Sequence, residues 1–137
     1  MKTIVLGYDD TAPAKRALER TAQLARAFHA DVVVVSVAPV LAPAAHGIGP
    51  IDPADPPELH EEQLEHATAL LRERGVEAES QAALGNPAGM ILDVAEERDA
   101  DMIIVGSREV GLVQRLLGQS VSGAVQRKAH CDVLIAH

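Results

Sequence analysis

Apolar, largely β-branched runs recur along the chain and are separated by longer stretches of mixed polarity. The runs cover residues 3–7 (TIVLG), 31–37 (DVVVVSV), 101–106 (DMIIVG) and 131–136 (CDVLIA). Their hydrophobicity is continuous rather than alternating, which is typical of parallel strands covered by helices on both faces. Residues 77–84 (EAESQAAL) alternate more and predict a weaker strand at an edge of the sheet.

The stretches between these runs have the three- and four-residue spacing of amphipathic helices. The first helix is expected after Thr11, with Pro13 in its first turn, and it extends to about Phe28. The second is expected to end at Gly75, since glycine suits the left-handed residue past a helix end. The four predicted helices begin at or near Thr11, Pro57, Asn86 and Ser120.

Strands and helices therefore alternate along one domain, residues 1–137. This order predicts an α/β fold with a single doubly wound, Rossmann-like sheet of five parallel strands and helices on both faces. Ligands bind such sheets beyond the carboxyl ends of the strands, where the strand order reverses. Residues 7–11, 37–39 and 106–122 are expected at that edge, beside a long loop from Pro39 to Pro57.

The amino-acid composition of the chain disfavours some classes of binding partner. The chain has one tyrosine, one phenylalanine and no tryptophan, so it lacks the aromatic platform of single-strand nucleic-acid binders. A net charge of −8 also disfavours binding to phosphate backbones, and we expect no nucleic-acid partner. The single cysteine, the lack of a signal-peptide pattern and the lack of an apolar run of membrane length indicate a cytoplasmic protein without a membrane partner.

Two segments carry candidate binding chemistry. Gly106 ends a predicted strand, and a glycine-containing loop leads from it to a helix that opens with Ser120 and Ser122. Helix-terminal amides with nearby hydroxyls suit a phosphate group, although tight turns and helix capping explain the same residues equally well. Asp9 follows the first strand and could accept hydrogen bonds from a ribose or a base, whereas Asp10 and Thr11 more simply cap the helix.

The histidines and the cysteine favour neither a metal site nor catalysis. His60 and His66 bracket three glutamates, and this set is expected on a solvated helix face. His130, Cys131 and Asp132 are consecutive, so their side chains converge poorly, and Cys131 is expected to be a small core residue. We assign no catalytic residue and no metal ligand, and an enzyme is the less favoured interpretation.

Three long segments resemble the universal stress protein family and together span essentially the whole chain. They are TIVLGYDDTAPAKRALERTAQLA, GNPAGMILDVAEERDADMIIVGSRE and LLGQSVSGAVQRKAHCDVLIAH. The resemblance implies an adenine nucleotide alpha hydrolase-like fold and a stress-response module. It also implies a homodimer, because dimers of this family commonly pair the last strand, here from Cys131 to Ala136, with its twin.

Some members of that family bind ATP through a loop of the form glycine, two residues, glycine, nine residues, glycine and a hydroxyl residue. Gly106 and Ser120 match its first and last positions, whereas Glu109 and Gln119 stand where glycines are expected. A carboxylate at Glu109 should repel phosphates, so AMP would be tolerated better than ATP with its Mg²⁺.

The resemblance also assigns parts of a nucleotide site. Adenine and ribose would border the end of the first strand, and the backbone of the second strand's end would meet adenine. Further residues would line the far wall and hold ribose and phosphates. The full set is Gly7, Tyr8, Asp9, Val37, Val105, Gly106, Arg108, Ser120, Val121 and Ser122.

Three functions remain open at this point. The first is a dimeric stress-response module that binds AMP or ATP. The second is a slow Mg²⁺-dependent ATP hydrolase, which needs a group to activate water and charge to stabilise the transferred phosphoryl. The third is a protein-interaction module whose pocket is vestigial.

Overall fold

Five parallel strands form a single sheet in the order β3-β2-β1-β4-β5. The structure is a computed structural model and describes residues 1–39, 57–107 and 121–137. The strands are β1 (Thr3–Gly7), β2 (Asp31–Pro39), β3 (Ala78–Gly85), β4 (Met102–Gly106) and β5 (Asp132–Ala136). The chain winds from β1 outward to β3, then returns to the other side of β1 for β4 and β5. The predicted doubly wound sheet is confirmed, and its strand order reverses between β1 and β4.

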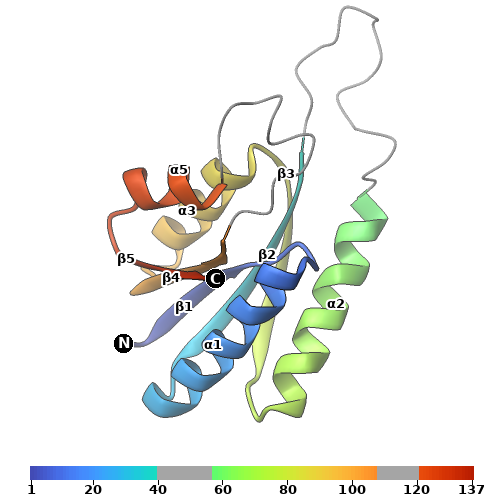
Figure 1. The fold of residues 1–137 in the computed structure, drawn as a ribbon, viewed down its shortest axis with the longest axis vertical. Coiled ribbons are helices and arrows are strands. Elements are labelled where there is room, and N and C mark those ends of the chain that lie inside the picture. Colours follow the sequence, from blue (N-terminus) through green and yellow to red (C-terminus); the bar gives the residue numbers. More distant parts are fainter. Residues whose placement is uncertain (40–56, 108–120) are drawn as a thin grey trace, which may run out of the picture.

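Helices cover both faces of this sheet (Figure 1). They are α1 (Ala12–Phe28), α2 (Pro57–Glu73), α3 (Pro87–Glu97) and α5 (Val121–Lys128). Helices α1 and α2 pack on one face, while α3 and α5 pack together on the other. The described elements agree with the sequence pattern to within one or two residues at most ends.

The helix ends follow the residues that predicted them. The Thr11 side chain caps α1 by accepting from the Ala14 N–H at 3.3 Å. Asn86 caps α3 in the same way, with its Oδ1 2.9 Å from the Gly89 nitrogen. Gly75 follows α2 with a φ of 80°, a conformation that glycine adopts without a steric penalty. Local hydrogen bonds therefore fix where these elements begin and end.

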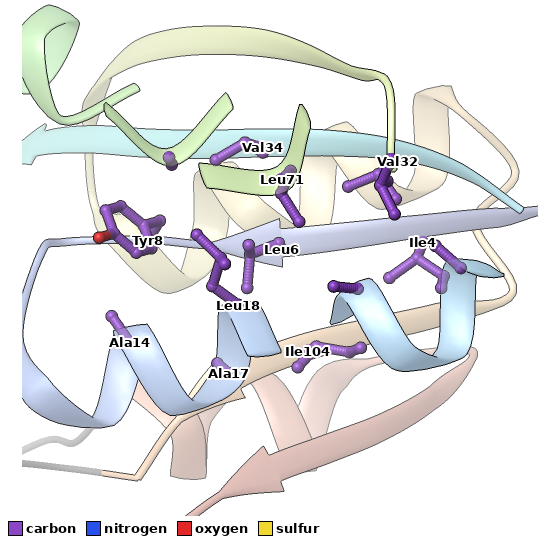
Figure 2. Close-up of a cluster of buried hydrophobic side chains, with 14 of the residues drawn as sticks. Ile4, Leu6, Tyr8, Ala14, Ala17, Leu18, Val32, Val34, Leu71 and Ile104 are labelled. Atoms are coloured by element: carbon purple, nitrogen blue, oxygen red, sulfur yellow. The ribbon is translucent and has the colours of Figure 1, made fainter. Parts of the chain in front are cut away.

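The core is aliphatic and divided into two layers by the sheet. Alternate strand residues point to opposite faces, so Ile4 and Leu6 meet α1 and α2, whereas Val5 packs with α3 and α5. Figure 2 shows the first layer, which also contains Tyr8. Tyr8 is 3% exposed, whereas Phe28, the other aromatic residue of the chain, is 52% exposed. The core is thus built almost without aromatic rings, as the composition requires.

One residue of α2 departs from expectation. His60 is 5% exposed, so the prediction that it lies on a solvated helix face is wrong. It shares the inward helix face with Leu64, Ala67 and Leu71, and its Nδ1 lies 2.6 Å from the buried Ser36 Oγ of β2. The three glutamates and His66 are exposed, as predicted.

The outer strands of the described sheet are β3 and β5. In β5, residues Val133, Leu134 and Ile135 are only partly buried, whereas the middle residues of β4 are fully covered. The part of the chain that the structure describes has no helix with both the length and the apolar character that crossing a membrane requires.

Candidate functional site

The carboxyl ends of three neighbouring strands bring most of the sequence-predicted site residues to one edge. Strand β1 pairs with β2 through Gly7 and Val35, and the Tyr8 N–H continues this pairing by donating to the Val35 carbonyl at 2.9 Å. On its other side β1 pairs with β4 through Leu6 and Ile104. The edge is therefore formed by Gly7 to Asp9, by Val37, and by Val105 with Gly106.

Asp9 lies just beyond β1 and is exposed. Its Oδ1 accepts hydrogen bonds from the Thr11 Oγ1 at 2.7 Å and the Thr11 N–H at 3.2 Å. Both contacts use one oxygen, so Oδ2 is the atom that a hydroxyl or amino group of a ligand can reach. An ionised carboxylate held in this way is a strong acceptor for ribose hydroxyls or an amino group.

Tyr8 makes its hydrogen bonds at this edge through its backbone N–H and its hydroxyl group, while its ring lies in the core. The ring packs in the core layer beneath α1 and α2 (Figure 2). The hydroxyl group donates to the Asp10 Oδ1 at 2.9 Å. Burial, with further contributions from Asp10 and Asp9, raises the pKa of Tyr8, which keeps the phenol protonated as a donor.

Two glycines at this edge have a packing role. A Cβ atom on Gly106 would lie 2.5 Å from the Pro13 carbonyl carbon, and one on Gly7 would lie 2.8 Å from the Ile91 Cδ1. Helices α1 and α3 therefore approach the strand ends more closely than a side chain would permit. Two explanations for Gly106 were left open by the sequence, a tight turn and a ligand site. The two are compatible, since close packing and close approach of the backbone to a ligand both require glycine.

Asp10 was expected to be a possible helix cap, but Thr11 is the cap of α1. Asp10 instead has a φ of 63°, and its Oδ1 lies 3.4 Å from the His66 Nδ1 and 3.9 Å from the Lys15 Nζ. Sequence reasoning missed this link between the end of β1 and helix α2. No local pattern joins residues 56 positions apart, and only the packing of α2 beside α1 brings them together.

The structure describes some of the other predicted site residues and not the rest. Val37 and Val105 are buried, Val121 is partly buried at the start of α5, and Ser122 is 8% exposed. Arg108, Glu109, Gln119 and Ser120 lie outside the described residues, as does the predicted loop between Pro39 and Pro57 apart from its two ends.

The described residues contain no group of three or more His, Cys, Asp or Glu side chains that could hold a metal ion. Cys131 is partly buried, and desolvation together with Asp132 and Asp101 raises the pKa of its thiol. A thiol that stays protonated is a weak nucleophile. At the carboxyl edge the described residues supply a carboxylate acceptor, Asp9, and aliphatic side chains, Val37 and Val105.

Comparison with known proteins agrees with this architecture. The model of the universal stress protein family matches residues 1–137. Universal stress protein Sll1654 of Synechocystis sp. is 30% identical over 138 residues, which cover 98% of this chain and 84% of the relative.

Solved structures also align along the whole chain. One is a universal stress protein from Archaeoglobus fulgidus in complex with dAMP, with a TM-score of 0.76 and 27% identity, covering 100% of this chain and 98% of that one. Another is a universal stress protein in complex with cAMP, with a TM-score of 0.74 and 28% identity, covering 99% and 96% of the two chains. The strand order, the residues at the carboxyl edge and these matches together show that the chain belongs to the universal stress protein family.

Proposed function

We propose that this universal stress protein is a cytoplasmic stress-response module that binds an adenine nucleotide with a single phosphate, such as AMP, at the carboxyl ends of β1, β2 and β4. The observation that carries the proposal is Asp9, which is exposed at the reversal of strand order with its Oδ1 already bound to Thr11. The related structures in complex with dAMP and cAMP support the same ligand class.

Each part of the nucleotide has a matching group. The ribose hydroxyls face Asp9, and adenine lies along the ends of β2 and β4. By the family resemblance Val37 would meet adenine through its backbone and Val105 would line the far wall, and the two residues are 9% and 3% exposed. By the same resemblance Ser120, Val121 and Ser122 would hold the ribose and the phosphate at the start of α5, and Arg108 would line the far wall.

A monophosphate fits this chain better than ATP. Glu109 and Gln119 replace two glycines of the family's phosphate loop. A carboxylate close to the β- and γ-phosphates adds like charge, which binding of ATP would have to overcome with Mg²⁺. Slow hydrolysis would further need a group that activates water. In this proposal the Asp9 Oδ2 binds the ribose hydroxyls, because Oδ1 already accepts from Thr11, so Asp9 is not the group that activates water.

We also propose that the protein is a homodimer through its last strand, from Cys131 to Ala136. Strand β5 is an outer strand with partly exposed Leu134 and Ile135, and an outer strand carries backbone groups that a second strand can bind. A groove beside it is lined by these residues together with Arg16 and Arg20 of α1. Sedimentation should give a dimer that Ile135→Lys converts to monomer.

The nucleotide proposal is tested first without added ligand. Mass spectrometry of small molecules released from the purified protein should detect an adenine nucleotide, and calorimetry should show AMP binding more tightly than ATP. No released nucleotide, and no heat with either ligand at ~1 mM, would overturn the proposal in favour of an interaction module.

A matched pair of variants tests the role of Asp9. Asp9→Asn keeps an oxygen for Thr11 but removes the ionised acceptor, and it should weaken AMP binding about tenfold or more. Asp132→Asn makes the same change at the exposed start of β5, at the opposite edge of the sheet, and should leave AMP affinity unchanged. Equal affinities of Asp9→Asn and the unaltered protein would contradict the assignment.

A further inference from the structure

The turn that carries Asp9 has an unusual backbone conformation at the next residue. Asp10 has a φ of 63°, in the left-handed region that residues with a side chain seldom adopt. Aspartate tolerates this region better than most residues, but the conformation is still less favourable than the right-handed one. Surrounding contacts must hold it, because an unrestrained turn would relax and take Asp9 with it.

Three side chains contact the same oxygen of Asp10, its Oδ1. The Tyr8 hydroxyl, anchored in the buried core, donates to the Asp10 Oδ1 at 2.9 Å. The His66 Nδ1 of α2 approaches the same oxygen to 3.4 Å. Lys15 of α1 adds a weaker contact at 3.9 Å. Asp10 is thus connected to the core and to both helices that flank the strand end.

We propose that Asp10, held by Tyr8 and His66, is a positioning residue that fixes the turn presenting Asp9, so that helix α2 helps to set the affinity for the nucleoside part of the ligand. This inference rests on the proposed nucleotide function. Tyr8 supplies a fixed point because its ring is buried, and the phenol remains a donor because the pKa of Tyr8 is raised. His66 supplies the connection to α2.

The structure makes this role separable from overall stability. The side chains of His66 and Asp10 are 52% and 40% exposed, and a polar contact between side chains of that exposure contributes little to folding. Loss of His66 should therefore loosen the turn without unfolding the domain. A turn that is correctly placed in only a fraction of molecules lowers the apparent affinity by that fraction.

Hydrogen exchange at the Thr11 amide, which donates to Asp9, measures the turn directly, and AMP calorimetry measures its consequence. His66→Ala should speed exchange at Thr11 and weaken AMP binding about fivefold, with a melting shift below ~3 °C. His66→Asn places an amide nitrogen where Nδ1 lies and should restore both properties. Asp10→Gly removes the carboxylate while easing the backbone, and should also speed exchange.

Arg72→Ala is the matched control, because it removes a different exposed contact of α2, the ion pair with Glu77, away from the turn. It should change neither exchange at Thr11 nor AMP affinity. Unchanged exchange and affinity in His66→Ala would overturn the inference while leaving nucleotide binding intact. Absence of AMP binding by the unaltered protein would overturn the proposed function and with it the effect of His66 on affinity, whereas the exchange measurements would still decide whether His66 holds the turn.

Discussion

The contact between Gly106 and the first turn of α1 allows a sharp test of the packing at the strand ends. A Cβ atom at Gly106 would lie 2.5 Å from the Pro13 carbonyl carbon, 2.7 Å from the Ala14 nitrogen and 2.8 Å from the Pro13 Cβ. Two of these three neighbours are backbone atoms at the start of a capped helix. They cannot turn aside as the end of a flexible side chain would, so Gly106→Ala must move α1 or the end of β4.

The size of the effect follows from this geometry. Inserting an atom into a well-packed region costs about 1–3 kcal/mol, and backbone neighbours favour the upper end of that range. For a domain of this length, 1 kcal/mol corresponds to a melting shift of about 3–4 °C. We therefore expect Gly106→Ala to lower the melting temperature by about 6–12 °C.

Gly89→Ala is the matched control. Gly89 lies in the first turn of α3, and its added Cβ would have no neighbour nearer than the Asn86 Oδ1 at 3.6 Å, an ordinary contact. Alanine is the better helix former by about 1 kcal/mol, so this variant should melt at the same or a higher temperature. Calorimetric or circular-dichroism melting of both variants without nucleotide tests the reasoning. A Gly106→Ala variant as stable as Gly89→Ala would refute it.

Two further predictions concern buried polar groups. Ser36→Ala should lower the free energy of unfolding by about 1–3 kcal/mol, because it removes a buried hydrogen bond of 2.6 Å between the Ser36 Oγ and the His60 Nδ1, and urea unfolding measures this loss. Because the pKa of Tyr8 is raised in the folded protein, the folded chain keeps a proton that the unfolded chain loses above about pH 10. The contribution of Tyr8 to the free energy of unfolding should therefore be fully present below that pH and should decrease above it. Tyr8→Phe should flatten this alkaline decline in pH-dependent melting, and an equally steep decline in that variant would assign it to other groups.

The fold could be predicted because its signals are local. Continuous valine and isoleucine runs predict β1, β2 and β4, and the caps Thr11 and Asn86 predict where α1 and α3 begin. The edge position of β3 also follows from its alternating pattern. Each of these features depends on residues that are neighbours in sequence, which is why periodicity and capping rules detect them.

Contacts between distant segments could not be predicted in the same way. The spacing of His60 with Leu64, Ala67 and Leu71 indicates an inward position, but the adjacent glutamates favoured a solvated face. Its partner Ser36 gave only a weak signal, as one polar residue in a run of valines. The link from Asp10 to His66 has no sequence signal, since it arises from the packing of α2 beside α1.

The two outer strands of the sheet differ in polarity, and this difference limits how the protein can assemble. Strand β3 exposes Glu79 and Ser80 along with Leu84, and a charged side chain on an outer strand discourages the addition of another strand. In β5 the residues after the exposed Asp132 are apolar, and Val133, Leu134 and Ile135 are partly exposed. Joining two copies through β5 would cover the apolar residues of β5 in both copies. Strand β3 would then be the outer strand at each end of the combined sheet. Assembly by this route closes after two chains, because the twofold product offers no further surface of the same kind for open-ended growth.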